Sequence, residues 1–238
     1  MAVIEIQVIS DIVCAWCYVA KRNLDQAISL YRKTYPGGKS DTFAITWTPY
    51  YLNYNPHSCS VEKHTLVDVR LPDTTPEQRE AMGKKMNAAG RAVGINFNWG
   101  GKIGPDTRDA HRLIHLAQTR RSGDHGNVDP DGEALDAVVE GLFEAYHVLA
   151  QDVSEKEVLR NIALRAGIQA AEVDRVLDSD EGADIVDKQA EESKKITNAG
   201  VPMLIIQGSH RVDSTPDPMD LMLLFVKVRE EQTEGQPA

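Results

Sequence analysis

Residues 3–24 read VIEIQVISDIVCAWCYVAKRNL, and this stretch decides the fold. It opens with an apolar run rich in β-branched residues, 3–9, which predicts a buried β-strand. The pair Ser10-Asp11 supplies turn chemistry. Apolar residues then recur at helical spacing over residues 19–30. The motif Cys14-Ala15-Trp16-Cys17 therefore lies where a strand passes into a helix, and its first cysteine is expected at or near the helix N-terminus.

A cysteine pair at this position suits thiol–disulfide exchange. The unpaired N–H groups at a helix N-terminus and the positive end of the helix dipole stabilise an anion. A thiolate is such an anion, and it is the nucleophile in disulfide exchange. We expect Cys14 to be the attacking thiol, exposed at the helix tip. Cys17, one turn further in, is expected to resolve the mixed disulfide.

The composition bounds the class of protein. The chain has 238 residues, enough for one domain with an insertion or for two small domains. Lys plus Arg is 26 and Asp plus Glu is 36, a net charge of −10 that argues against a nucleic-acid-binding surface. No apolar run approaches the ~20 residues that span a bilayer, and no signal peptide is seen. We expect a cytoplasmic protein that does not bind membranes.

Helical signals dominate the middle of the chain. Residues 42–51 mix β-branched and aromatic residues and predict a second strand, which gives one parallel βαβ unit. From about residue 60 the pattern predicts only helices, with 122–131 as a polar turn. Helices are predicted at residues 75–93, 133–150, 170–177 and 183–198. Another helix begins at Asp106 or Thr107, and one more begins with a capping box at 154–157 and ends at Gly167. Residues 203–207 and 210–212 then predict a hairpin, and 218–228 a last helix.

With the helical middle removed, this order of elements resembles the thioredoxin fold. The long helical insertion after the second strand resembles the DsbA family, and residues 10–18, SDIVCAWCY, look like the motif of its FrnE-like branch. Residues 107–113, TRDAHRL, 142–146, LFEAY, and 200–202, GVP, also fit that branch. The resemblance covers residues 3 to about 228. One departure is Ala15, which stands where the branch usually has proline.

The resemblance implies roles for individual residues. Cys14 matches the nucleophile, Cys17 the resolving thiol, and Trp16 a wall of the active site. Pro202 matches the proline of a cis bond beside the active site, which leaves the backbone of Val201 free to pair with a bound peptide or glutathione. We therefore expect Trp16, Val201 and Pro202 to bind substrate.

Taken together, these observations predict an α/β protein with a thioredoxin-like fold and a large all-helical insertion. The thioredoxin-like domain is expected at residues 1–60 and 183–230, the insertion at 61–182, and a disordered tail at 231–238. The predicted function is that of a DsbA-like protein disulfide oxidoreductase that needs no cofactor and binds no metal. Its substrates would be protein or small-molecule disulfides, with glutathione as a co-substrate to be tested. The sequence does not define an oligomeric state.

Three other functions stay open. The cysteine pair could be half of a zinc site completed by Cys59 and His64, although zinc needs four well-placed ligands. The related 2-hydroxychromene-2-carboxylate isomerases and kappa-class glutathione transferases usually have a reactive serine, and Cys17 argues against that activity. The third alternative is a binding module without catalytic activity. His111 and His115 are interpreted as ordinary helix residues, and Asp11 as a turn former rather than a carboxylate that raises the thiol pKa.

Overall fold

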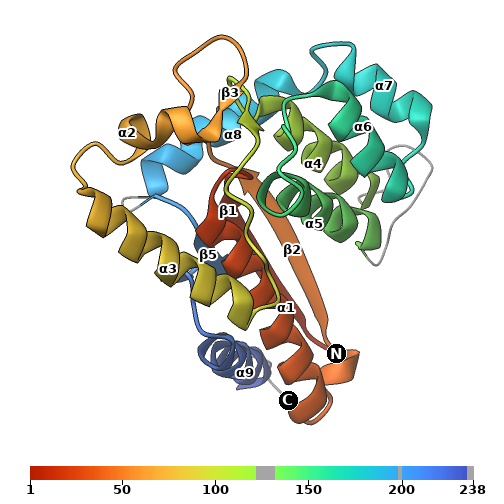
Figure 1. The fold of residues 1–238 in the computed structure, drawn as a ribbon. Coiled ribbons are helices and arrows are strands. Elements are labelled where there is room, and N and C mark those ends of the chain that lie inside the picture. Colours follow the sequence, from red (N-terminus) through yellow and green to blue (C-terminus); the bar gives the residue numbers. More distant parts are fainter. Residues whose placement is uncertain (122–131, 198–199, 235–238) are drawn as a thin grey trace.

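The computed structural model describes residues 1–121, 132–197 and 200–234, and its centre is a four-stranded mixed sheet (Figure 1). The strands are β1 (Val3–Ser10), β2 (Thr42–Pro49), β5 (Met203–Ile206) and β6 (His210–Asp213), in the order β2-β1-β5-β6. β1 runs parallel to β2 and antiparallel to β5, and β5 is antiparallel to β6. β1 is thus a central strand, which explains why its sequence is a nearly continuous β-branched run.

Helices cover both faces of this sheet. On one face Ile4, Ile6 and Val8 pack with α1 (Ala15–Thr34) and α9 (Pro218–Glu234), two helices that also contact each other. On the other face Ile9 packs with Met203, Ile205 and the end of α8 (Ala183–Ile196). Successive side chains of a strand point to opposite faces, so the two sets come from alternate positions in β1. The predicted thioredoxin-like arrangement is confirmed.

The insertion lies between β2 and α8 (Figure 1). Its helices are α2 (Val67–Arg70), α3 (Pro76–Ala92), α4 (Arg108–Arg121), α5 (Glu133–His147), α6 (Lys156–Arg165) and α7 (Ala170–Leu177), preceded by a 3₁₀ turn, Lys63–Leu66. A stacked ring pair, Tyr18 of α1 and Phe143 of α5, joins the insertion to the thioredoxin-like part, with 5.1 Å between the centroids. The side chains of both parts belong to one hydrophobic core.

The insertion is not entirely helical, contrary to the sequence prediction. β3 (Val61–Glu62) and β4 (Lys102–Ile103) form a two-stranded antiparallel sheet within it. The Asn55 side chain fixes the crossing, because its Nδ2 donates to the carbonyl oxygens of Cys59 and Ile103. Backbone groups that leave solvent need partners, and two short extended segments side by side satisfy each other. Strands of two residues carry no periodicity that a sequence pattern could reveal.

The ends of several elements also differ from the prediction. α9 continues to Glu234, four residues into the segment expected as a disordered tail. The start of α6 has no capping box, because the hydroxyl of Ser154 bonds to Asp152 rather than to the helix. The predicted polar turn at 122–131, residue 198 of the predicted helix and residues 235–238 of the tail lie outside the described residues. The division into two domains stays a prediction. Among the described helices, none is long and apolar enough to cross a lipid bilayer.

Candidate thiol active site

The cysteine motif sits in the turn that joins β1 to α1. The Cys14 amide donates to the carbonyl of Asp11 at 3.1 Å, which closes a turn directly after the strand. Cys14 is then the N-cap of α1, with an extended backbone, and its own carbonyl accepts from the amides of Cys17 and Tyr18. The predicted position of the first cysteine at a helix N-terminus is confirmed.

Both thiols are free and buried, which corrects one expectation. Cys14 is only 7% exposed and Cys17 only 1%, so Cys14 does not stand out from the helix tip. Its sulfur lies 3.7 Å from the carbonyl oxygen of Val201, a residue 187 positions later, and this loop closes over the thiol. The sequence could place Cys14 at a helix end, but it could not show that a distant loop covers that end.

The environment separates the acidities of the two thiols. A hydrogen bond from the Cys17 side chain lowers the pKa of Cys14, and the backbone amides of Cys17 and Trp16 lower it further. These contributions outweigh burial and the negative charge of Asp11, both of which raise it. Burial raises the pKa of Cys17 well above its ordinary value, as does the adjacent Cys14. Cys14 is therefore the thiol that ionises first, and Cys17 keeps its proton.

A loop with a cis peptide bond forms one wall of the site. The Val201–Pro202 bond is cis, as predicted, and Gly200 before it has a φ of 89°, a conformation that side chains disfavour. β5 follows at once and pairs Met203 with Ile9, which holds the loop against the turn that carries Cys14. No described residue accepts a hydrogen bond from the Val201 amide.

Trp16 forms part of the surface next to the motif. It is partly buried, and its carbonyl accepts a hydrogen bond from the Thr215 hydroxyl at 3.4 Å. The ammonium of Lys85 on α3 lies 5.9 Å from the centre of its ring. The half-exposed ring is placed where it can contact a molecule bound near Cys14.

Asp11 does more than form a turn. Its Oδ2 accepts from the Leu52 amide at 2.7 Å, which ties the segment after β2 to the thiol turn. Its charge also raises the pKa of both thiols, so the turn role and the electrostatic role coexist. The other oxygen, Oδ1, lies 3.6 Å from Nε2 of His111, which is 3% exposed. His111 therefore belongs to the surroundings of the site and not to an ordinary helix surface.

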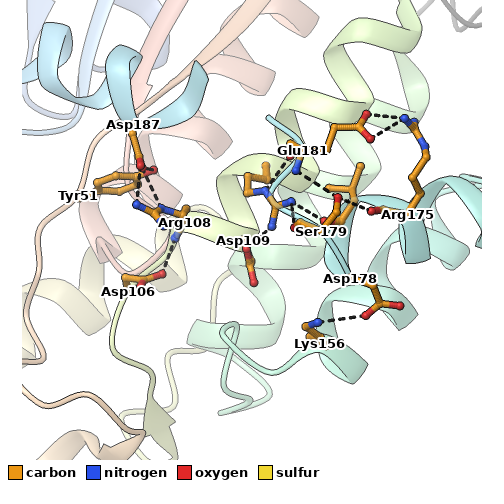
Figure 2. A network of polar contacts seen from close by, with 12 residues as sticks. Tyr51, Asp106, Arg108, Asp109, Lys156, Arg175, Asp178, Ser179, Glu181 and Asp187 are labelled. Atoms are coloured by element: carbon orange, nitrogen blue, oxygen red, sulfur yellow. Dashed lines mark hydrogen bonds and ion pairs between the residues drawn. The ribbon is translucent and has the colours of Figure 1, made fainter. Parts of the chain in front are cut away.

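A set of polar contacts adjoins His111 on the side of Tyr51. The ring of Tyr51 lies 5.7 Å from that of His111, and its hydroxyl donates to Asp187 at 3.0 Å. Arg108 also binds Asp187, through Nε at 3.0 Å and Nη2 at 2.5 Å. Figure 2 shows these three side chains directed toward one another from the segment after β2, from α4 and from α8. The insertion is thus fastened close to the thiol turn.

The insertion also supplies a buried histidine. Nε2 of His147, at the end of α5, donates to the carbonyl of Ile12 at 2.9 Å. Burial lowers the pKa of His147 to about 3, so the ring is neutral at physiological pH and serves as a hydrogen-bond donor. It holds the backbone two residues before Cys14.

The zinc alternative finds no geometric support. Among the described residues, no group of three or more His, Cys, Asp or Glu side chains is arranged to hold a metal ion. Cys59 is exposed in the loop after β2, and its carbonyl accepts from Asn55. Whether the purified protein carries a metal stays a prediction, to be checked by elemental analysis.

Comparisons with known proteins agree with this architecture. A family model described as a DSBA-like thioredoxin domain matches residues 5–223. A probable DsbA oxidoreductase from Streptomyces coelicolor is similar in structure, with a TM-score of 0.72 and 24% identity, over 99% of this chain and 92% of that chain.

Two further solved structures share the fold at lower identity. A 2-hydroxychromene-2-carboxylate isomerase has a TM-score of 0.61 and 12% identity, over 98% of this chain and 100% of that one. The cytosolic disulfide reductase DsbM from Pseudomonas aeruginosa has a TM-score of 0.57 and 16% identity, over 94% and 98%. No curated protein matches the chain.

Proposed function

The chain belongs to the DSBA-like thioredoxin domain family, and on that premise we propose that it is a thiol–disulfide oxidoreductase whose reactive pair is Cys14 and Cys17. The observation that carries the proposal is the position of Cys14 as N-cap of α1, 3.7 Å from the Val201 carbonyl, with Cys17 one turn further along the helix. The directions of the thiol pKa shifts agree with it, because hydrogen bonds lower the pKa of Cys14 and burial raises that of Cys17. Perturbed pKa values cluster at functional sites.

The exchange then takes two steps. The Cys14 thiolate attacks one sulfur of a substrate disulfide, forms a mixed disulfide and releases the other sulfur as a thiolate. Cys17 next gives up its proton and attacks the sulfur of Cys14, which forms the Cys14–Cys17 disulfide and releases the second substrate thiolate. The substrate gains two electrons and the protein loses two. The same steps in reverse oxidise a dithiol.

Three further residues are proposed to bind the substrate. The backbone of Val201 lies beside Cys14, with its carbonyl 3.7 Å from the sulfur and with an amide for which no described residue is an acceptor, and Pro202 follows it directly. An extended segment next to the reactive sulfur can pair with this backbone, as strands pair in a sheet. Trp16 would contact the apolar part of the same segment.

A glutathione-dependent isomerase or transferase is the second candidate, because a 2-hydroxychromene-2-carboxylate isomerase shares the fold. The retained and buried Cys17 argues for disulfide chemistry instead. Glutathione is proposed as a co-substrate in either case, and DsbM has been solved with GSH. The cytosolic placement of DsbM is consistent with the same compartment for this protein, and membership of the FrnE-like branch stays a prediction.

Trapping experiments test the assignment of the two cysteines. The Cys17→Ser variant should accumulate mixed disulfides with a model substrate, because it can attack but cannot resolve. Cys14→Ser should lose exchange, whereas Cys59→Ser, which changes an exposed thiol, is the matched control and should behave as wild type. The readout is non-reducing electrophoresis with mass spectrometry. Wild-type turnover by Cys17→Ser would contradict the resolving role and would favour the isomerase.

A further inference from the structure

Two buried polar atoms face each other next to the thiol turn. Oδ1 of Asp11 and Nε2 of His111 lie 3.6 Å apart, in side chains that are 1% and 3% exposed. Within the described part of the chain, neither atom has a hydrogen-bond partner. The distance is too long for a good hydrogen bond but short enough for an ion pair. A carboxylate oxygen and an unprotonated imidazole nitrogen are both acceptors, so the two atoms attract each other only when a proton lies between them.

The carboxylate of Asp11 needs a cation. The amide of Leu52 donates to Oδ2 at 2.7 Å, and among the described residues no lysine or arginine forms an ion pair with Asp11. A buried charge is costly unless it is paired. Imidazole is ordinarily a stronger base than a carboxylate, so a proton shared by the two side chains resides on the histidine. A protonated His111 supplies the partner that the carboxylate lacks.

Asp11 connects this contact to the reactive thiol. Its carbonyl accepts from the Cys14 amide at 3.1 Å and closes the turn that places Cys14 at the start of α1. Its negative charge raises the pKa of both thiols. A positive charge within 4 Å of that carboxylate offsets part of this repulsion. The charge on His111 therefore acts on Cys14 through Asp11.

A second histidine contacts the next residue of the same turn and provides a comparison. Nε2 of His147 donates to the carbonyl of Ile12 at 2.9 Å, and the ring is neutral because burial lowers its pKa to about 3. A carbonyl needs only an N–H group, whereas a carboxylate binds a charged donor more strongly. The two imidazoles thus hold consecutive residues of the turn, from α4 and from α5, and differ in the charge of the group that they face.

The groups on the Tyr51 side of His111 keep their charge near neutral pH. The ring of Tyr51 lies 5.7 Å from that of His111, and burial raises the pKa of its hydroxyl, which donates to Asp187. Asp187 is in turn paired with Arg108, as Figure 2 shows. A neutral phenol and a closed ion pair therefore border His111 on this side.

On the side of the thiols, Tyr54 and Tyr146 sense the charge of Asp11. Burial raises the pKa of both phenols, that of Tyr54 to about 12, so both are neutral at physiological pH. Lys63 is different, because burial lowers its pKa to about 8, and it lies 3.6 Å from the centre of the Tyr146 ring. Lys63 is present in every variant compared below, so its contribution cancels.

We propose that His111 is a positioning residue of the thiol–disulfide exchange, whose protonated ring pairs with Asp11 and offsets part of its charge, so that the Cys14 thiolate forms more readily. This inference rests on the proposed function of Cys14. His111 touches no substrate in this scheme and acts only through the carboxylate. When the ring loses its proton, the full charge of Asp11 acts on the thiol.

A double-mutant cycle tests the route through Asp11. Alkylation of Cys14 by iodoacetamide is followed across pH 5–9 in wild type, His111→Gln, Asp11→Asn and the double variant. Glutamine can donate to a carboxylate but carries no charge, so His111→Gln should react about two- to threefold more slowly than wild type at pH 6, with its profile moved to higher pH. In the Asp11→Asn background a buried imidazole has no anion to keep it charged, and the same substitution should change the rate by less than about 1.3-fold.

The matched control is His115→Gln, because His115 lies one turn further along α4 and is partly buried. It should leave the profile of Cys14 where it is in wild type. Equal slowing by His111→Gln with and without the Asp11 carboxylate would show that the effect does not pass through Asp11 and would overturn the proposal. An unchanged profile in His111→Gln would overturn it as well.

The proton can also be observed in the wild-type protein, which avoids any loss of folding in a variant. Nitrogen-15 spectra at pH 6 should show both ring nitrogens of His111 protonated, but only Nε2 protonated in His147. In Asp11→Asn, His111 should be neutral at the same pH. An unprotonated Nε2 of His111 in wild type would exclude the ion pair and overturn the proposal.

Failure of this inference and failure of the proposed function give different results. Reduction of hydroxyethyl disulfide, which is uncharged, is measured in parallel with reduced protein. If the disulfide reacts and the cycle shows no coupling between His111 and Asp11, only the positioning role is wrong. If the cycle shows coupling in alkylation and no disulfide reacts, the positioning of the Cys14 thiolate is supported and the proposed function is wrong.

Discussion

Cys14 is acidic because of its neighbours and in spite of its burial. The Cys17 thiol and the first amides of α1 stabilise the thiolate, whereas the carboxylate of Asp11 and the loss of water destabilise it. The balance between these contributions sets how much thiolate is present near neutral pH, and therefore how fast the protein attacks a disulfide.

Asp11→Asn should shift this balance toward the thiolate. Removal of a like charge lowers the pKa of Cys14 further, so the pH profile of its alkylation should move to lower pH, with the rate at pH 6 roughly two- to fivefold higher. Asparagine can still accept from the Leu52 amide, so the turn should persist. The measurement is iodoacetamide alkylation across pH 5–9 with peptide mapping by mass spectrometry.

The control for this prediction is Asp73→Asn, which neutralises an exposed carboxylate in the loop before α3. It should leave the profile of Cys14 where it is in wild type. A profile of Asp11→Asn that moves to higher pH would show that Asp11 stabilises the thiolate, against the electrostatic argument.

The sequence predicted three residues of the site, two from a local motif and one from the family resemblance. The Cys-x-x-Cys spacing predicted Cys14 and Cys17, and the family resemblance predicted Pro202. His111 and His147 reach the surroundings of the thiols from helices that begin roughly a hundred residues later. The stretch 107–113 matched the family, but nothing in either local sequence predicted a contact with the thiol turn. Their position depends on how the insertion packs against the sheet, a property of tertiary contacts that a single sequence does not display.

At the scale of elements, the starts of two helices show where prediction from sequence succeeded and where it failed. Thr75 and Gln78 form a capping box at the start of α3, where the sequence predicted a helix start but no capping box. Ser154 matched the same pattern but has a nearer partner in Asp152, and the cap is lost. The hydroxyl of Ser154 is oriented toward the Asp152 carboxylate by the geometry of the folded loop, which the sequence pattern does not contain.

The end of α7 is held by an arginine from another helix. Arg112 of α4 is buried, and its guanidinium donates to the carbonyl oxygens of Val176, Ser179 and Glu181. The last carbonyls of a helix lack partners within the helix and carry partial negative charge, so a cation satisfies both needs. Figure 2 shows this region, in which Ser179 and Glu181 lie close to Arg175.

Arg112→Met should therefore lower the free energy of unfolding by about 2–4 kcal/mol, because it removes the donor of one buried carbonyl, that of Val176, and of two partly buried ones, those of Ser179 and Glu181. Arg175→Met is the matched control. It removes an exposed ion pair with Glu181 in the same network and should cost less than about 1 kcal/mol. Urea unfolding followed by circular dichroism measures both. Equal losses for the two variants would show that the carbonyl contacts of Arg112 contribute little.

At the scale of the molecule, the fold class follows from the order of elements in the sequence. A β-branched strand, a helix with the cysteine pair at its start, a second strand and a late hairpin after a proline are enough to indicate a thioredoxin-like fold. The two-residue strands β3 and β4 and the burial of Cys14 could not be predicted, since both result from segments that meet only in the folded chain.

The shared core of the two parts has a consequence for how the protein melts. Side chains of β1, α1 and α9 and those of α4–α7 belong to one continuous cluster, so neither part can lose its packing without exposing the other. We expect a single cooperative transition in which far-ultraviolet ellipticity and tryptophan fluorescence change at the same temperature. Phe143→Ala in the insertion and Phe225→Ala in α9 should both lower that one temperature. A calorimetric trace with two separate peaks would show instead that the chain melts as two independent units.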